Sequence, residues 1–184
     1  MQPPDIRVVL DLRGTTVTIR PITPADKEIE AAFVRNLSEQ SRYYRFHAAL
    51  KALTPEQLER FTNMAYPDNM ALIATLHEDG NEKQIAVARY AKFPDQDAAE
   101  VAIVVADEWQ DLGLGRRLLI ELRNVAVAAG IHELQMNVLT ENRRMMKLAQ
   151  DLGFRTTPTV DDYTTRQLGK TISSEPPASD SGNV

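Results

Sequence analysis

The segment from Glu100 to Arg117 reads EVAIVVADEWQDLGLGRR, and the interpretation of the whole chain starts from it. It opens with an unbroken apolar run, Val101 to Ala106, which is typical of a buried strand. A short polar turn follows, and the next residues carry apolar side chains at helical spacing. These apolar positions are Leu114, Leu118, Leu122, Val125 and Ala129. The segment therefore predicts a buried strand, a tight loop and an amphipathic helix.

The loop contains Gly113 and Gly115, which allow a sharp turn and the close approach of another molecule. The first N–H groups of the following helix have no partner within the helix, and the helix dipole places positive charge at this end. The pattern therefore predicts a site for a phosphate-bearing ligand. The alternative is that the glycines serve only the geometry of the helix start, because short glycine motifs also occur without a ligand.

The composition limits the classes of function. With 184 residues, 43% of them hydrophobic, the chain is long enough for one domain with its own core. The net charge of -5 and the absence of a basic stripe argue against a nucleic-acid partner. The sequence has no cysteine and only three scattered histidines, which argues against disulfides and a metal site. No apolar run approaches the ~20 residues of a membrane span, so we expect a cytoplasmic protein without a membrane partner.

Four short apolar runs before Glu100 predict antiparallel strands. Val8 to Leu12 and Thr15 to Ile19 alternate or are β-branched and flank Arg13-Gly14, which predicts a first hairpin or a bent first strand. Met70 to Leu76 and Ile85 to Ala91 flank an Asp-Gly-Asn sequence, which is a second hairpin signal. With the buried run that follows Glu100, the second hairpin predicts three antiparallel strands in succession.

Capping patterns at Thr23 and Thr54 predict two helices, which end near Leu37 and Tyr66. The segment between them, Ser38 to Leu50, has two interpretations. Its clustered aromatic and basic side chains favour a surface that faces a substrate. The same aromatic residues are equally consistent with a short helix that packs them partly into the core, and both interpretations can hold. The aromatic residues concerned are Tyr43, Tyr44 and Phe46.

The residues after the central helix predict a βαβ unit and a closing hairpin. Glu133 to Leu139 is the next strand, expected to run parallel to the central strand through a right-handed crossover. Thr140 is expected to cap a last helix, Glu141 to Leu152. Phe154 to Val160 and Tyr163 to Leu168 predict the final hairpin.

The composition at the end of the chain predicts where the domain stops. Residues from Ser173 onward are rich in serine, proline and aspartate and carry almost no apolar side chains. We therefore expect a single domain over residues 1–170 and a disordered tail over residues 171–184.

The order of elements and two motifs resemble the GNAT superfamily of acyl-CoA-dependent N-acyltransferases. Gln110-Asp-Leu-Gly113-Leu-Gly115 is similar to the family's pyrophosphate loop, and Asn142-Arg-Arg-Met-Met with Leu152-Gly153-Phe154 is similar to its second signature. The resemblance extends from about Val8 to Leu168. It implies an α+β (mixed α/β) GNAT fold. Its central mixed, mostly antiparallel sheet would have about seven strands, flanked by about four to five helices.

A narrower likeness concerns the acetyltransferase domain of Pat-type bacterial protein lysine acetyltransferases. Four stretches carry it, beginning at Ser41, Thr54, Met70 and Glu141. In that group the domain is often fused to a regulatory domain. The likeness implies a protein lysine as the acetyl acceptor.

The resemblance also implies which residues bind acetyl-CoA, the expected co-substrate, in a cleft between the central strand and the strand after it. Backbone groups of Val104 and Val105 would bond the pantetheine arm like an added strand. The loop would hold the pyrophosphate, and Asn142 would reach the pantetheine. The loop residues concerned are Gln110, Leu112, Gly113, Leu114, Gly115 and Arg116.

Glu100 is the candidate general base. Acyl transfer requires a neutral amine, and a carboxylate beside the thioester can take the proton directly or through one water. The position of Glu100 resembles that of the general-base glutamate in the Pat-type domains, and the alternative is a solvated acid at a strand start. Many GNAT enzymes carry a tyrosine seven residues after the motif asparagine, where this chain has Ala149, so the general acid is not identified. Tyr66, Tyr90 and Tyr163 are the remaining tyrosine candidates for it, although packing roles are more typical of such residues.

Two other functions remain open from the sequence. One is acetylation of a small amine such as a polyamine, an amino acid or a drug. The other is a non-catalytic acyl-CoA-binding sensor that retains the fold. The protein is expected to act as a monomer or homodimer, with acetyl-CoA and an amine acceptor as its partners.

Overall fold

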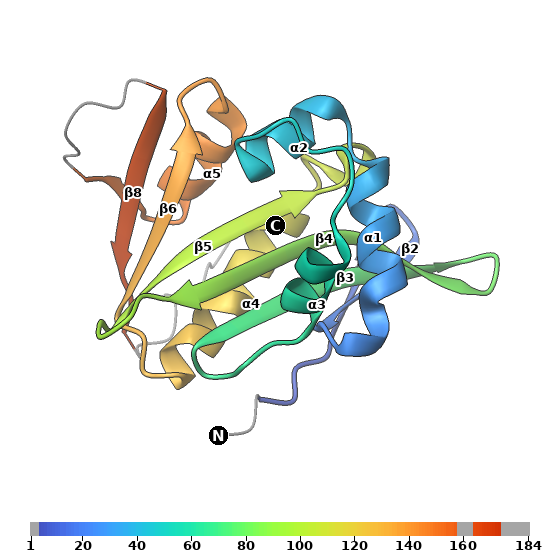
Figure 1. The fold of residues 1–184 in the computed structure, drawn as a ribbon, viewed down its shortest axis with the longest axis horizontal. Helices are drawn as coiled ribbons and strands as arrows, with labels where there is room; N and C mark the ends of the chain where they lie inside the picture. Colours follow the sequence, from blue (N-terminus) through green and yellow to red (C-terminus); the bar gives the residue numbers. More distant parts are fainter. Residues whose placement is uncertain (1–3, 158–163, 174–184) are drawn as a thin grey trace, which may run out of the picture.

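The computed structural model describes residues 4–157 and 164–173, which form one open sheet covered by helices on both faces (Figure 1). The strands are β1 (Val8–Leu12), β2 (Thr15–Pro21), β3 (Asn69–Glu78), β4 (Asn81–Lys92), β5 (Ala98–Val105), β6 (Glu133–Leu139), β7 (Arg155–Thr156) and β8 (Thr165–Thr171). The α-helices are α1 (Lys27–Asn36), α2 (Glu39–Phe46), α3 (Pro55–Thr62), α4 (Leu114–Ala128) and α5 (Arg143–Asp151). Two 3-10 turns, Pro24–Asp26 and Asp107–Trp109, precede α1 and follow β5.

The strand order is β1-β2-β3-β4-β5-β6-β8-β7. Only β5 and β6 pair in parallel, and every other neighbouring pair is antiparallel. The predicted α+β fold with a mixed, mostly antiparallel sheet is confirmed, and the described part of the chain has eight strands where about seven were expected. The predicted βαβ unit is also confirmed, because α4 joins the two parallel strands.

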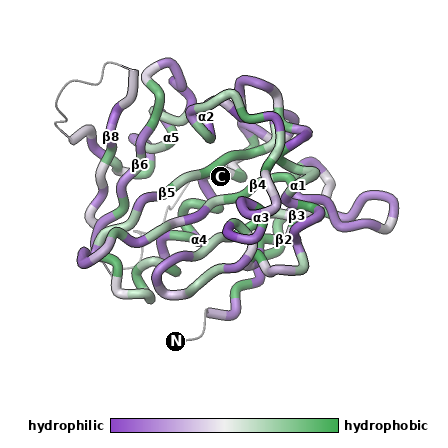
Figure 2. Tube along the Cα trace, viewed as in Figure 1, coloured by the Kyte–Doolittle hydropathy of each residue, from purple (hydrophilic) through white to green (hydrophobic). Residues whose placement is uncertain are grey.

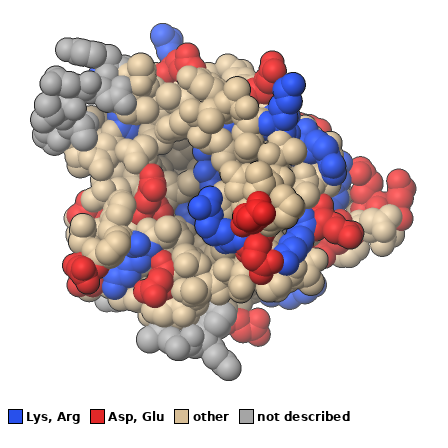
Figure 3. Space-filling view, viewed as in Figure 1, with Lys and Arg blue, Asp and Glu red and all other residues tan. Residues whose placement is uncertain are grey.

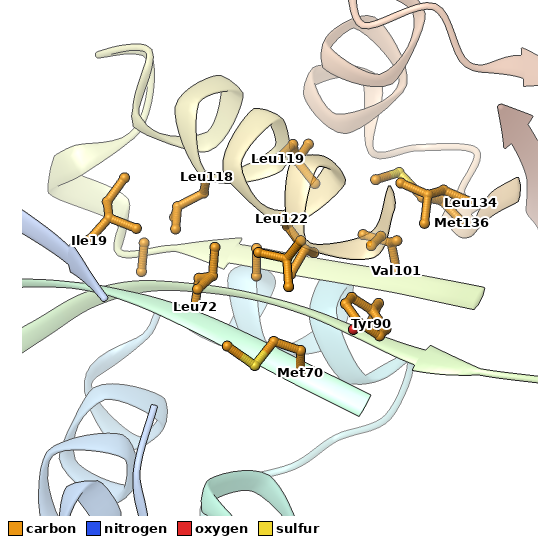
Figure 4. Packing of buried hydrophobic residues seen from close by; sticks show 14 of the residues in the cluster. Ile19, Met70, Leu72, Tyr90, Val101, Leu118, Leu119, Leu122, Leu134 and Met136 are labelled. Atoms are coloured by element: carbon orange, nitrogen blue, oxygen red, sulfur yellow. The ribbon is translucent and has the colours of Figure 1, made fainter. Parts of the chain in front are cut away.

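Every residue of strand β3 from Met70 to Leu76 is buried, because both faces of the strand are covered there. Met70 and Leu72 point into the core beneath α4, whereas Ala71 and Ile73 point into a second core beneath α1. Figure 4 shows the first core, in which leucines of α4 pack against side chains of the central strands. In Figure 2 the central strands are coloured as hydrophobic, while the projecting tip of the β3–β4 hairpin is hydrophilic.

The helix starts show which capping predictions hold. At α3 the box is complete, since Gln57 donates its backbone N–H to the Thr54 hydroxyl and its side chain accepts from the Thr54 backbone N–H. At α5 the prediction of Thr140 as the cap is wrong. The Asn142 side chain accepts from the Met145 backbone N–H at 3.1 Å, and Thr140 instead bonds the carbonyl of Thr164.

Two further boundaries differ from the sequence predictions, and the structure also places the aromatic residues of α2. Helix α3 ends at Thr62, four residues before Tyr66, because the Asn69 side chain accepts from the Ala65 backbone N–H in a turn. Of the aromatic residues with two interpretations, Tyr43 is 43% exposed on α2, whereas Phe46 packs partly buried against the second core. The domain extends past residue 170, since Ile172 is buried and donates its N–H to the His132 carbonyl.

Parts of two predictions fall outside the described residues. Of the closing hairpin, β7 covers only Arg155–Thr156 and pairs antiparallel with β8. The end of the first expected strand, the expected turn at Asp161-Asp162 and Tyr163 lie outside the described residues. The same holds for residues 174–184 of the expected tail. Within the described part of the chain, no helix combines the length and apolarity that crossing a membrane requires.

Candidate active site

A cleft opens where the parallel strands separate. β5 and β6 pair only over Ala98–Glu100 and Glu133–Gln135, and beyond this point the two strands diverge (Figure 1). The side chains along the gap line a cavity of about 850 Å³, which Figure 3 shows as a dark hollow in the surface. The cleft therefore lies at the position that the sequence predicted, between the central strand and the strand after it.

The glycine loop closes one end of this cavity. Gly113 has the left-handed backbone angle φ of +79°, and α4 begins at the next residue. The first helical bond is donated by Arg117 to the Gly113 carbonyl, so the N–H groups of Leu114, Gly115 and Arg116 have no acceptor within the described residues. These donors and the positive end of α4 fit a pyrophosphate group.

Substituting Gly113 with alanine is expected to weaken CoA binding about tenfold, or ~1.4 kcal/mol. An alanine at positive φ is strained by about 1–2 kcal/mol, and relief of that strain moves the loop donors. The Kd of CoA measured by calorimetry checks this. Gly80→Ala is the matched control, since Gly80 has the same φ of +79° and no neighbouring atom within 4 Å, but lies in the distant β3–β4 turn. Equal losses of CoA affinity in both variants would contradict the loop assignment.

The strand edge beside the cleft offers a different pair of residues from the predicted Val104 and Val105. Ala106 donates its N–H to the Ile85 carbonyl on β4, so backbone groups on β5 alternate between β4 and the cleft from that point. By this alternation Val104 bonds β4, whereas Val105 and Ile103 face the cleft. Ile103 is therefore a residue that the sequence reasoning missed, because strand register cannot be read from an unbroken apolar run.

Gln110 braces the loop rather than pointing freely into the cavity. Its amide nitrogen donates to the Val105 carbonyl at 3.0 Å and to the Ser41 hydroxyl at 3.3 Å, while its oxygen accepts from Arg144 at 2.8 Å. One side chain thus connects β5, α2 and α5. A motif glutamine at this position holds the walls of the cleft together.

Asp107 fastens the start of α2 to the end of β5. Its carboxylate accepts from the Ser38 backbone N–H at 3.0 Å, the Ser38 hydroxyl at 2.7 Å and the Ser41 hydroxyl at 2.8 Å. Burial alone would raise the pKa of Asp107, but these hydrogen bonds outweigh it and hold the pKa below its usual value. The ionised form is therefore the one that stabilises this wall of the cavity.

We expect the contribution of Asp107 to stability to disappear in acid. Its pKa is lower in the folded than in the unfolded protein, so the stabilisation is complete above the unfolded value of about 3.9 and is lost as the pH falls through the folded value. Asp107→Asn should thus lower Tm at pH 7 and make Tm less sensitive to acidification below about pH 4. Asp5→Asn, an equal charge change at an exposed site, is the control. A Tm–pH curve of Asp107→Asn that parallels the wild-type curve would refute the assignment.

Glu100 lies in the mouth of the cleft, with its side chain exposed to the cavity. Asn137, on β6, donates from its side-chain nitrogen to Glu100 Oε1 at 2.9 Å. This hydrogen bond orients the carboxylate across the gap between the two strands and leaves Oε2 available. Asn142 lines the same cavity from the start of α5, where its side-chain oxygen is already used as the helix cap.

The match to known proteins agrees with this geometry. The family described as Acetyltransferase (GNAT) domain matches residues 16–155. The chain belongs to the GNAT acetyltransferase family. Acetyltransferase PA5475 from Pseudomonas aeruginosa is 34% identical over 151 residues, which make up 82% of this chain and 81% of that protein.

Two further relatives carry the name Pat. The GNAT domain of S. lividans PAT has a solved structure that matches with a TM-score of 0.81 and 31% identity, covering 90% of this chain and 97% of that chain. Acetyltransferase Pat from Mycolicibacterium smegmatis is 31% identical over 141 residues, which are 76% of this chain and 41% of that protein. This GNAT acetyltransferase thus spans less than half the length of that Pat, but nearly all of the isolated GNAT domain.

The tyrosine candidates for a general acid can now be located. In this GNAT acetyltransferase Tyr90 is 1% exposed, its hydroxyl donates to the Pro67 carbonyl at 3.1 Å, and burial raises its pKa above the usual value. Tyr90 is therefore a packing residue with a protonated hydroxyl. Tyr66 packs partly buried against the core, and Tyr163 lies outside the described residues. Ala149 is completely buried, so its position leaves no side chain in the cleft.

The predicted ligand-binding residues converge on the cavity, with two exceptions. The residues among them that line it are Glu100, Val104, Val105, Gln110, Gly113, Gly115, Arg116 and Asn142. Leu112 and Leu114 are not in the lining, and the Leu114 side chain is buried in the core, so only their backbone groups could contribute. Sequence reasoning missed Arg89 on β4 and did not single out Arg45 on α2, although both line the cavity. Arginine within the apolar strand β4 was the available signal.

Proposed function

We propose that this acetyltransferase transfers the acetyl group of acetyl-CoA to a protein lysine side chain, with Glu100 as the general base. The observation that carries the proposal is the position of Glu100. Its carboxylate, oriented by Asn137, lies in the same cavity as the loop of Gly113 but at the opposite end of β5. A thioester laid along β5 from that loop would present its carbonyl close to Glu100.

The chemistry required of the protein is mainly positioning and one proton transfer. Less than about a thousandth of lysine side chains are neutral at pH 7, because the lysine pKa is about 10.4. Glu100 takes a proton from the bound amine, directly or through a water, and the neutral nitrogen attacks the thioester carbonyl. The CoA thiolate then leaves and takes up a proton. Of the described tyrosines, Tyr44 and Tyr90 line the cavity, and the Tyr90 hydroxyl is already donated to the Pro67 carbonyl.

The choice of a protein acceptor is supported by the relatives named Pat and by the shape of the site. The hollow opens at the surface in Figure 3, where a lysine on a folded partner has access to it. Steady release of free thiol from acetyl-CoA, with acetyl-lysine detected by mass spectrometry on an added protein, tests the proposal. Release with polyamines or amino acids alone would assign a small-amine acetyltransferase. Binding of CoA without thiol release for any acceptor would favour a sensor.

A further inference from the structure

The end of the cavity beyond Glu100 is walled by arginine and aromatic side chains. They come from α2, α3 and β4 and are Arg45, Phe46, Phe61 and Arg89. The rings of Phe46 and Phe61 stack with centroids 6.4 Å apart and an interplanar angle of 14°. Figure 3 shows basic atoms on the side of the hollow that faces α2 and α3. This wall faces the space where the acceptor must enter, because the glycine loop occupies the other end.

Arg89 is already neutralised by protein groups. Its Nη2 donates to Glu30 Oε1 at 2.9 Å, and its Nη1 donates to the Phe61 carbonyl at 3.2 Å. Its guanidinium also lies 4.3 Å from the centroid of the Phe61 ring. Glu30 is 1% exposed and has Arg89 as its ionic partner. Arg89 therefore fixes the wall but has little charge left for a ligand.

Arg45 is in the opposite situation. Its guanidinium carbon lies 4.9 Å from the centroid of the Phe46 ring, but it donates to no acceptor within residues 4–157 and 164–173. Burial and the nearby Arg89 lower its pKa to about 10, while Glu30 and Glu100 act in the other direction. A pKa of about 10 still leaves the guanidinium charged at neutral pH. The wall thus presents one cation whose hydrogen-bond donors are unused.

The contacts around Arg45 favour the acceptor end of the cleft over the phosphate end. Ser41, one helical turn earlier on α2, bonds Asp107 and Gln110 beyond the end of β5. Arg45 instead packs on the ring of Phe46, which stacks on Phe61 beside Arg89. Arg89 in turn pairs on the sheet with Ala102, two residues from Glu100. About 17 Å of strand separate Glu100 from Val105, at ~3.3 Å per residue. Arg45 is therefore at the acceptor end of the cleft and not at the phosphate end.

We propose that Arg45 binds a carboxylate of the acceptor, so that the preferred acceptor carries a carboxylate next to its reactive amine. The inference rests on the proposed function, since it assigns the substrate class of the same site. Glu100 would receive the amine while Arg45 forms a charge-assisted pair, bidentate where the geometry allows, with the carboxylate. A polyamine would instead bring a second cation against Arg45, which disfavours that class. The carboxylate can belong to a free amino acid or to an acidic residue beside a lysine in a polypeptide.

Matched acceptors test this inference and distinguish the two sources. One pair is free lysine and lysinamide, and the other is a lysine peptide with glutamate or glutamine as the neighbouring residue. We expect kcat/KM to favour the carboxylate member of at least one pair by about tenfold or more, since one charge-assisted hydrogen bond is of that order. Preference within the first pair identifies an amino acid, and preference within the second identifies an acidic protein sequence.

Arg45→Met removes the charge at similar length and should abolish that preference. It should lower kcat/KM for the carboxylate acceptor about tenfold while changing the amide acceptor and the KM of acetyl-CoA less than about twofold. Arg45→Lys should restore part of the preference, which a purely structural role would not explain. Thermal melting with and without CoA checks that each variant is folded.

Three results would overturn the inference. One is transfer that ignores the carboxylate in the wild type. Another is a preference that persists in Arg45→Met. The third concerns the acyl donor: succinyl-CoA carries a carboxylate on its acyl group and acetyl-CoA does not. If Arg45→Met changed only the ratio of kcat/KM for these two donors, Arg45 would lie against the acyl group. Failure to acetylate any acceptor would overturn the proposed transferase function and, with it, this inference. In each of the three results above, by contrast, the enzyme still transfers an acyl group, so the two kinds of failure can be told apart.

Discussion

Glu100→Gln is expected to lower kcat by about 10²–10⁴-fold, the usual contribution of a positioned general base. Glutamine keeps the size of the side chain and can still pair with Asn137 after a flip of the amide, so the cleft should keep its shape. The Kd of CoA should stay within about twofold of wild type, because the carboxylate does not belong to the phosphate end. Steady-state thiol release and calorimetry measure the two quantities separately.

The pH profile makes this result specific to proton removal. Without a base, the variant depends on the small neutral fraction of the amine, which grows about tenfold per pH unit below its pKa of about 10.4. The relative defect of Glu100→Gln should therefore shrink between pH 7 and pH 9. Glu28→Gln, an equal change at an exposed site on α1 outside the cavity, is the control and should match wild type. A Glu100→Gln defect that stays constant with pH would point to a binding role for Glu100.

Glu30→Ala is expected to destabilise the fold by about 3–5 kcal/mol, the largest effect on stability that we expect from one substitution in this chain. Glu30 is 1% exposed and accepts from Arg89 and from the Gln84 side chain. Removing the carboxylate leaves the guanidinium of Arg89, whose side chain is 12% exposed, without its counter-charge. Because domains of this size are stable by only about 5–15 kcal/mol, the variant should lose a large part of its stability.

Urea unfolding followed by circular dichroism measures this loss as a lower midpoint concentration with an unchanged slope. Glu28→Ala, two residues earlier on the exposed face of α1, is the matched control and should change the stability by less than about 0.5 kcal/mol. The double variant Glu30→Leu with Arg89→Met should recover much of the loss, since it leaves no unpaired buried charge. A double variant as unstable as Glu30→Ala would show that lost packing, rather than the orphaned charge, is the cause.

Most of the fold could be predicted from the sequence because its signals are local. The alternation around Gly14, the hairpin signal at Gly80 and the capping box at Thr54 are each contained in a few residues. Competing local signals caused the wrong boundaries. Both Thr140 and Asn142 are good caps; in the folded chain the Thr140 hydroxyl is donated to the Thr164 carbonyl, and Asn142 caps the helix.

In the candidate site, too, residues with a local sequence signal could be predicted, and residues defined by contacts between distant elements could not. Gly113 was recognisable because its positive φ restricts the residue type at that position. Ile103 was not, because a strand edge is defined by its partner strands and not by its own side chains. Arg45 was visible as one of the basic residues on α2. That its guanidinium contacts the Phe46 ring but no hydrogen-bond acceptor in the described part of the chain is a property of the folded wall around it.

The sequence by itself determined the order of the elements, the GNAT resemblance and the loop that fits a pyrophosphate, because these depend on periodicity and on the backbone freedom of a few glycines. The tertiary structure alone decided where the cleft opens and which side chains face it. It places Arg45 over the Phe46 ring, with no hydrogen-bond acceptor among the described residues. It also separates β5 from β6 after Glu100, turns Asn137 toward that carboxylate and pairs Arg89 with Glu30. These relations join residues distant in the chain, and charge pairing across such distances is fixed only when the elements pack.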